Sequence, residues 1–171
     1  MIILACEGPS EVYLLEKLME TKTLVFDAED ILDRRPIHAR QPRKLLPLIS
    51  LLPIDTDFVV FRIGDTLREE FDLSCLGKAR MARTKVNKVC TKPEIEILII
   101  IREHLLEEYQ KCRSKMSPKE FVKSRVKGFN GISSYLMDHD LVSAIREYKR
   151  IKRNEKDELY LADLLKDEAK S

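Results

Sequence analysis

The spacing of apolar residues predicts strands in the first half of the chain. Four short apolar or alternating runs have the length and composition of strands, namely residues 2–6, 23–26, 57–63 and 85–90. The run at 2–6 is bounded by a Gly-Pro turn, and the run at 57–63 ends in Gly-Asp-Thr. We expect both to be buried strands.

Helical spacing of apolar residues fills most of the remaining chain. It predicts helices over 9–20 and 43–51, with a polar loop at 27–41, and it continues beyond Pro93 almost to the end. Four helices are expected in that last part. The first begins after Pro93, the second begins at Pro118 with Ser117 as its N-cap, and the other two cover 139–152 and 159–167. Strand, helix and strand in this order predict an α/β fold with a parallel β-sheet flanked by helices, followed by an all-helical C-terminal portion.

Composition narrows the class of protein. The 171 residues are 44% hydrophobic and 35% charged, with a formal net charge of only +2. These values indicate one globular domain without a global basic field. The four cysteines show no metal-binding spacing, and the longest apolar run, 97–101, is too short to cross a membrane. With no secretory signal in the sequence, we expect a cytoplasmic protein with reduced thiols and no membrane partner.

Two acidic residues stand where a parallel sheet would place an active site. Glu7 follows the first strand and Asp65 follows the third. If those strands are neighbours, both carboxylates lie at the switch point of the sheet, where they could hold Mg²⁺, or Mn²⁺ in its place. Glu96 opens a helix after the fourth strand and is a third candidate. The alternatives are ordinary ones, since such acids often serve only as turn formers, helix caps or partners of the helix dipole.

Two motifs resemble a known family. Residues 4–11 read Leu-Ala-Cys-Glu-Gly-Pro-Ser-Glu and resemble the opening of TOPRIM domains, above all those of the RloB-like and OLD-nuclease-like proteins of bacterial defence, which often read Cys-Glu-Gly-x-x-Glu. Residues 92–100 are similar to the Asn-Pro-x-Phe-Glu-x-Trp-Leu-Leu segment of RloB-like proteins. The resemblance implies one TOPRIM-like (Rossmann-like) domain over 1–171, with its core in 1–101 and a helical extension in 102–171. It also implies catalytic roles for Glu7, Asp65 and Glu96, with Glu7 and Asp65 as metal ligands.

One departure from the family pattern concerns the third strand. TOPRIM domains usually end this strand in Asp-x-Asp, but here Leu67 stands at the second position. Glu69 and Glu70 are the nearest acids that could replace the missing ligand. Two-metal chemistry therefore lacks one of its usual ligands.

Basic residues are clustered rather than spread evenly. One run between the candidate acids contains no acidic residue and holds Lys78, Arg80, Arg83, Lys85, Lys88 and Lys92. Local positive charge beside an acidic metal site is what a nuclease needs in order to bind phosphates. The alternative is a solvated surface, which is the usual role of a charge run.

These observations lead to two hypotheses. The first is a metal-dependent nucleic-acid phosphodiesterase (nuclease) of TOPRIM/RloB-like type, acting in phage defence, with nucleic acid as substrate and an ATPase encoded elsewhere as a partner. The second is a degenerate, non-catalytic TOPRIM-like module that binds a nucleic acid or a protein, which the replacement at Leu67 favours. A small-molecule phosphotransferase is not supported, because the chain has no Gly-rich phosphate loop.

Overall fold

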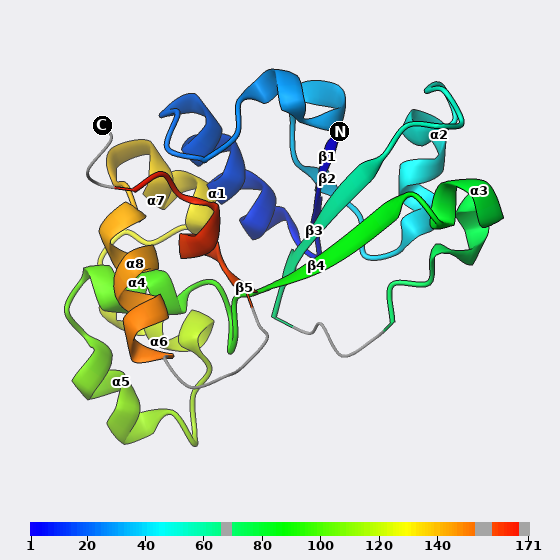
Figure 1. The fold of residues 1–171 in the computed structure, drawn as a ribbon. Helices are drawn as coiled ribbons and strands as arrows, with labels where there is room; N and C mark the ends of the chain where they lie inside the picture. Colours follow the sequence, from blue (N-terminus) through cyan, green and yellow to red (C-terminus); the bar gives the residue numbers. More distant parts are fainter. Residues whose placement is uncertain (66–69, 153–158, 168–171) are drawn as a thin grey trace.

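The fold is an α/β fold built on a parallel sheet (Figure 1). A computed structural model of the protein describes residues 1–65, 70–152 and 159–167. Within these residues the sheet has five strands in the order β2-β1-β3-β4-β5, all of them parallel. The strands are β1 (Ile2–Cys6), β2 (Ile37–His38), β3 (Phe58–Gly64), β4 (Thr84–Cys90) and β5 (Leu159–Tyr160). The predicted α/β class and parallel sheet are confirmed.

The helices are short apart from the first. They are α1 (Pro9–Glu20), α2 (Leu46–Ile49), α3 (Lys78–Met81), α4 (Ile97–Arg102), α5 (Leu106–Cys112), α6 (Pro118–Arg125), α7 (Ile132–Asp138) and α8 (Val142–Ile151). Single 3-10 turns are η1 (Ala28–Asp30), η2 (Leu32–Arg34), η3 (Pro42–Leu45), η4 (Leu73–Leu76) and η5 (Leu161–Leu164). Figure 1 shows α4 to α8 gathered on one side of the sheet and α2 and α3 on the other.

The sheet separates two apolar clusters. Leu4, Ile63 and Val89 point to the larger one, which includes residues of α1 and of the C-terminal helices. Ile3 and Val60 point to the smaller one, which is closed by α2 and the turns on that side. A parallel strand buried on both faces needs apolar residues at successive positions, and this explains the continuous apolar runs of β1 and β3.

The strand order places the ends of β1 and β3 together. β1 lies between β2 and β3, and Cys6 is paired with Ile63. Because all strands are parallel, Glu7 and Asp65 leave the sheet at the same edge. The predicted neighbourhood of the first and third strands, with another strand outside the first, is therefore confirmed.

The strand predicted at 23–26 is wrong, and the loop predicted at 27–41 contains a strand. Residues 23–26 lie outside the sheet, and Leu24 forms only an isolated antiparallel bridge with Leu165. The second strand is instead β2, inside the segment predicted to be a polar loop. Leu24 is buried while Val25 is 53% exposed, so this segment covers an edge of the core and is not an inner strand. The helix predicted at 43–51 is present as the turn η3 followed by the four residues of α2.

The C-terminal part is not all helical. After α8 the chain returns to the sheet, where β5 pairs in parallel with the end of β4. The helix predicted at 159–167 is replaced by β5 and η5. Tyr160 packs edge-on against Tyr148 of α8, and no local sequence pattern predicts this tertiary contact. The N-cap prediction is confirmed, because the Ser117 side chain accepts a hydrogen bond from Glu120 N–H at the start of α6. None of the helices among the described residues could span a membrane.

Candidate functional site

Glu7 is held in one position at the end of β1. Its backbone N–H donates to the carbonyl of Ile63 at 2.9 Å, which continues the β1–β3 ladder by one residue. Its side chain is only 5% exposed, and Oε1 accepts a hydrogen bond from Nη2 of Arg62 at 2.7 Å. The carboxylate lies against Gly64, where a Cβ atom would stand 2.2 Å from Glu7 Oε2. A side chain at position 64 would therefore displace the Glu7 carboxylate.

Arg62 is a site residue that the sequence analysis missed. It lies in the middle of the sheet, and its side chain is 2% exposed. It is paired with Ala5 in β1, whose small side chain leaves room on that face, and its guanidinium stands 5.4 Å from the ring centre of Phe71. The signal in the sequence is a single charged residue at an inward position of an otherwise apolar strand. A charge in that place requires a partner, which is Glu7.

Glu11 is the second site residue that the sequence analysis did not single out. It lies in the first turn of α1 and is 7% exposed. Burial raises the pKa of its carboxyl to about 6, a hydrogen bond with its own backbone partly opposes this, and the charges of Asp65, Glu96 and Glu7 raise it further. Glu11 therefore lies within electrostatic reach of the three acids Asp65, Glu96 and Glu7. The available signal was the last residue of the Cys-Glu-Gly-x-x-Glu pattern.

Glu96 joins this group from the start of α4. It is the N-cap residue of the helix and is 6% exposed. Burial raises the pKa of its carboxyl, and the charges of Glu94 and Asp65 act in the same direction, while Lys119 and a backbone hydrogen bond lower it. Glu94 itself accepts a hydrogen bond from the backbone N–H of Lys119 at the start of α6, so it stabilises a neighbouring helix.

The acidic site therefore combines Glu7, Glu11, Asp65 and Glu96. Of the predicted site residues, the structure brings Glu7, Asp65 and Glu96 to the carboxyl edge of the sheet. Leu67 and Glu69 lie outside the described residues. Glu70 is exposed and lines a separate cavity of about 390 Å³ together with Arg40 and Arg43.

The donor set can be compared with the needs of a metal ion. All four groups offer oxygen, and Mg²⁺ is usually held by one or two carboxylates together with water and phosphate. Over residues 1–65, 70–152 and 159–167, no three His, Cys, Asp or Glu side chains form a group that could hold a metal. One oxygen of Glu7 is already bonded to Arg62. The described residues thus do not form an all-protein cage, and a cation held there by two carboxylates would have to take its remaining ligands from water or phosphate.

The predicted basic run is divided between the two ends of the sheet. Lys78, Arg80 and Arg83 precede β4. The seven residues of β4 span about 20 Å at roughly 3.3 Å per residue, so the length of this strand separates these cations from the acids. Arg80 is 9% exposed and donates to the carbonyl of Leu52 at 2.7 Å. Arg83 pairs with Asp57 at 3.1 Å.

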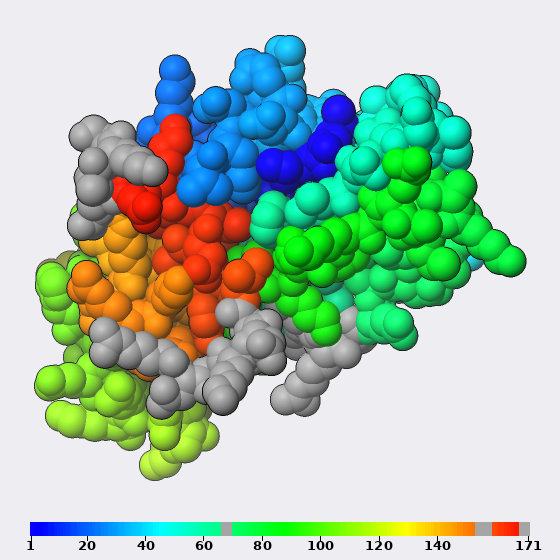
Figure 2. Space-filling view, in the orientation of Figure 1, coloured from blue at the N-terminus to red at the C-terminus, as the bar shows by residue number. Residues whose placement is uncertain are grey.

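The rest of the run lies along β4 and beyond its end. Lys85 and Lys88 are exposed on β4, and Figure 2 shows the β4 segment, in green, at the surface of the molecule. Lys88 and Lys92 lie toward the acidic edge. Two further side chains reach this edge from β2 and the residues after it, since His38 Nε2 and Arg40 Nε each lie 3.1 Å from the carbonyl oxygen of Glu7.

Comparisons with known proteins yield no relative for this chain. It matches no family model, no curated protein and no solved structure. The likeness to TOPRIM domains therefore continues to depend on the two sequence motifs.

Proposed function

We propose that the protein is a metal-dependent nucleic-acid phosphodiesterase of TOPRIM-like, RloB-like type. The supporting observation is the acidic group at the switch point of a parallel sheet, in which burial and mutual repulsion raise the pKa of Glu11 to about 6. Ligands of α/β proteins bind in this crevice. A buried group of like charges is costly in the free protein, and a divalent cation would offset that cost.

The described side chains suggest a division of roles. Mg²⁺ or Mn²⁺, when bound, would stabilise charge on the phosphate and lower the pKa of a water molecule. Glu7 and Asp65 are the proposed ligands, with Arg62 fixing the orientation of the Glu7 carboxylate. Glu11 is the proposed general base, because a pKa of about 6 leaves it mostly ionised at neutral pH and still able to accept a proton. Glu96 is a further ligand or a positioning acid.

The proposed setting follows from the resemblance alone. RloB-like proteins belong to bacterial defence systems, so we propose action on phage nucleic acid, in the cytoplasm, with an ATPase as partner. Lys88, Lys92 and Arg40 are the described cations best placed to contact the phosphates. Arg80, bonded to the carbonyl of Leu52, is left out of the proposed surface.

Cleavage assays test this proposal directly. The protein is incubated with DNA and with RNA in the presence of Mg²⁺ or Mn²⁺, alongside Glu7→Gln and Glu11→Gln. We expect each variant to lose activity by about 100-fold, the lower range for a general acid or base. Glu20→Gln, on the exposed end of α1, is the matched control. Equal cleavage by all variants, or none by any of them with either metal, would contradict the proposal.

A second candidate function is a non-catalytic module that binds nucleic acid or protein. The Glu7–Arg62 ion pair favours it, because a ligand that already has a buried cation as partner has less need of a metal. Calorimetric titration with Mg²⁺ separates the two functions. Binding that is lost in both Glu7→Asn and Asp65→Asn supports the phosphodiesterase. Absence of such binding supports the module.

A further inference from the structure

A cavity of about 720 Å³ opens beside the acidic site. Asp65 forms part of its wall, and so does Ile97, the residue after Glu96. The rest of the wall comes from Lys92 and Pro93 after β4 and from α4, α5, α8 and the residues that follow α5 and α8. It is largely apolar, with Ile101 and Tyr109 among its members. A mostly apolar cavity of this volume with a few polar groups is typical of sites for small organic ligands.

The polar groups of this cavity favour an anion at its rim. Arg113 follows α5 and Lys152 follows α8, and both line the cavity. Neither forms an ion pair with an acidic side chain in the part of the chain that the structure describes. In the same set of residues the hydroxyl of Tyr109 has no hydrogen-bond partner. The cavity therefore combines an apolar wall, the Tyr109 hydroxyl and, besides Lys92, two cations that have no acidic partner among the described residues.

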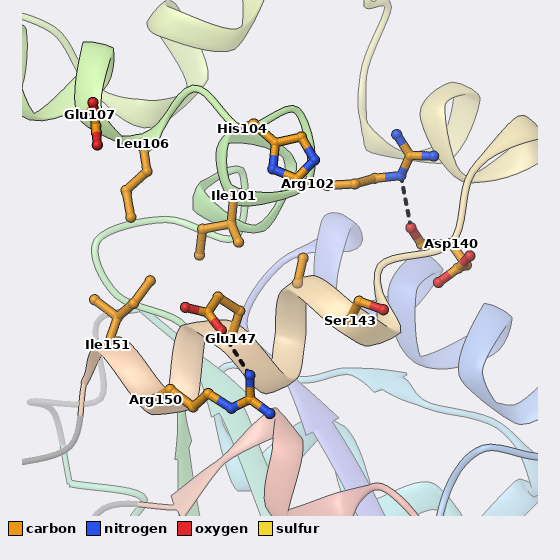
Figure 3. A pocket seen from close by; sticks show the side chains of 11 residues that line it. Ile101, Arg102, His104, Leu106, Glu107, Asp140, Ser143, Glu147, Arg150 and Ile151 are labelled. Atoms are coloured by element: carbon orange, nitrogen blue, oxygen red, sulfur yellow. Dashed lines mark hydrogen bonds and ion pairs between the residues drawn. The ribbon is translucent and has the colours of Figure 1, made fainter. Parts of the chain in front are cut away.

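A neighbouring cavity of about 850 Å³ provides a contrast (Figure 3). Ile101, Leu106 and Ile151 line both cavities and form their common wall. Figure 3 shows these three side chains at one end and Arg102, Asp140 and Ser143 at the other. There Arg150 pairs with Glu147 at 3.2 Å, and Arg102 donates to the carbonyl of Asp140 at 3.2 Å. Because its cations already have partners, the second cavity does not favour an anion.

We propose that the cavity beside Asp65 binds one unpaired nucleotide of a single-stranded nucleic acid. The base lies against Ile97, Ile101 and Tyr109, and the phosphate lies between Arg113 and Lys152. This inference rests on the proposed function, since it places the nucleotide next to the phosphate that the acidic site would cleave. A base inside a duplex cannot enter such a cavity without leaving its stack, so the substrate is single-stranded.

The test measures binding separately from cleavage. A short fluorescein-labelled oligothymidylate, and the same strand in a duplex with oligoadenylate, are titrated with the protein in EDTA by fluorescence anisotropy. The wild type should bind the single strand more tightly than the duplex. The double variant Arg113→Glu, Lys152→Glu should weaken single-strand binding by at least about tenfold and make the slope of log K against log salt shallower by about 0.7, the value for one phosphate contact on a single strand.

Two controls make the test specific. Lys111→Glu removes a positive charge from the exposed side of α5 outside the cavity, and it should change binding by less than about twofold. Gln110→Trp places a large ring at the cavity and should weaken binding, whereas Lys111→Trp should not. Circular dichroism confirms that each variant is folded.

The results distinguish the two proposals. Equal binding of single strand and duplex, or unchanged binding by the cavity variants, would overturn the cavity proposal even if the protein cleaves nucleic acid. Cavity-dependent binding without cleavage in any metal would support the cavity proposal and refute only the phosphodiesterase.

Discussion

The charged side chains at the two ends of the sheet have opposite kinds of neighbours. At the amino end, Arg80 donates to main-chain carbonyls and Arg83 pairs with an exposed Asp57. At the carboxyl end, Glu7, Glu11 and Glu96 are all nearly inaccessible to solvent, and the charges of neighbouring acids raise the pKa of both Glu11 and Glu96. Folding therefore satisfies the charges at one end and brings like charges together at the other.

This difference indicates where a ligand would change the energy of the molecule most. Arg80 and Arg83 at the amino end already have partners, so an anion bound to either of them would have to replace existing contacts. Neighbouring acids at the carboxyl end raise the pKa of Glu11 and of Glu96, and a cation placed among them would relieve that repulsion. Within this end Glu7 differs from Glu11, because Glu7 has Arg62 as a buried counter-ion.

The largest expected effect comes from breaking the buried ion pair between Glu7 and Arg62 at the carboxyl end. Arg62→Met leaves Glu7 without its buried cation and should lower the free energy of unfolding by about 3–5 kcal/mol. Urea denaturation measures the loss. Adding Glu7→Gln to Arg62→Met should restore much of the stability, because the uncompensated charge is then removed. Equal stability of the single and double variants would show that the ion pair does not hold Glu7 in place.

Removing a repelling charge at the same end should raise the free energy of unfolding instead of lowering it. The pKa of Glu11 is about 6 in the folded protein against an ordinary value of 4.5, so its ionisation costs about 2 kcal/mol at the rate of 1.36 kcal/mol for each pH unit. The cost is absent below pH 4.5, grows as the pH rises to 6, and is complete above that. Glu11→Gln should therefore stabilise the protein by about 2 kcal/mol above pH 6.

Thermal unfolding across this pH range checks the sign as well as the size. The gain from Glu11→Gln should shrink as the pH falls from 6 and should vanish below 4.5. Glu20→Gln changes the exposed last residue of α1, which is not buried among other acids, and should show no such dependence. A gain that is constant with pH would mean that Glu11 is not perturbed in the folded state.

At the amino end, Arg80→Met tests whether a buried cation can be wholly structural. The variant loses the hydrogen bond to the Leu52 carbonyl and should be destabilised by about 1.5 kcal/mol, with no loss of nucleic-acid binding. Chemical denaturation and the anisotropy assay measure the two quantities. A large loss of binding in a stable variant would return Arg80 to the nucleic-acid surface.

The smallest effect is expected at Arg83. Its ion pair with Asp57 is exposed on both sides, so Arg83→Gln should change stability by less than about 0.5 kcal/mol. Lys88→Gln should be equally mild in stability and should weaken nucleic-acid binding, because Lys88 lies toward the acidic edge. If Arg83→Gln weakens binding as much as Lys88→Gln, the two ends of the sheet do not differ in the way proposed.

Local patterns predicted the long elements and missed the short ones. β1, α1 and β3 agree with the sequence because each has enough apolar residues to display its period. β2 and β5 have two residues each, too few for any period, and exist only because neighbouring strands offer them hydrogen bonds. Residues 23–26 looked like a strand, yet their partner, Leu165, comes from the other end of the chain.

The site residues also divide into those that the sequence predicted and those that it did not. Glu7 and Asp65 could be placed at one edge from the order of the strands, and Glu96 from its motif. Glu11 and Arg62 left only weak signals, namely the last residue of the acidic motif and a lone charge in an apolar strand, because their importance depends on burial. The local sequence does not show that the first turn of α1 is buried or that Arg62 is paired with Ala5 in the sheet.

The sequence by itself thus determined the α/β class, the edge at which the acids gather and the residues that open the acidic motif, since these follow from local periodicity and from chain order. Only the tertiary structure decided which acids lose contact with water, which one receives a buried cation, and which cations of a single run lie near them. Desolvation and charge–charge interaction depend on distances between segments remote in the chain, and those distances are fixed only when the helices pack on the sheet.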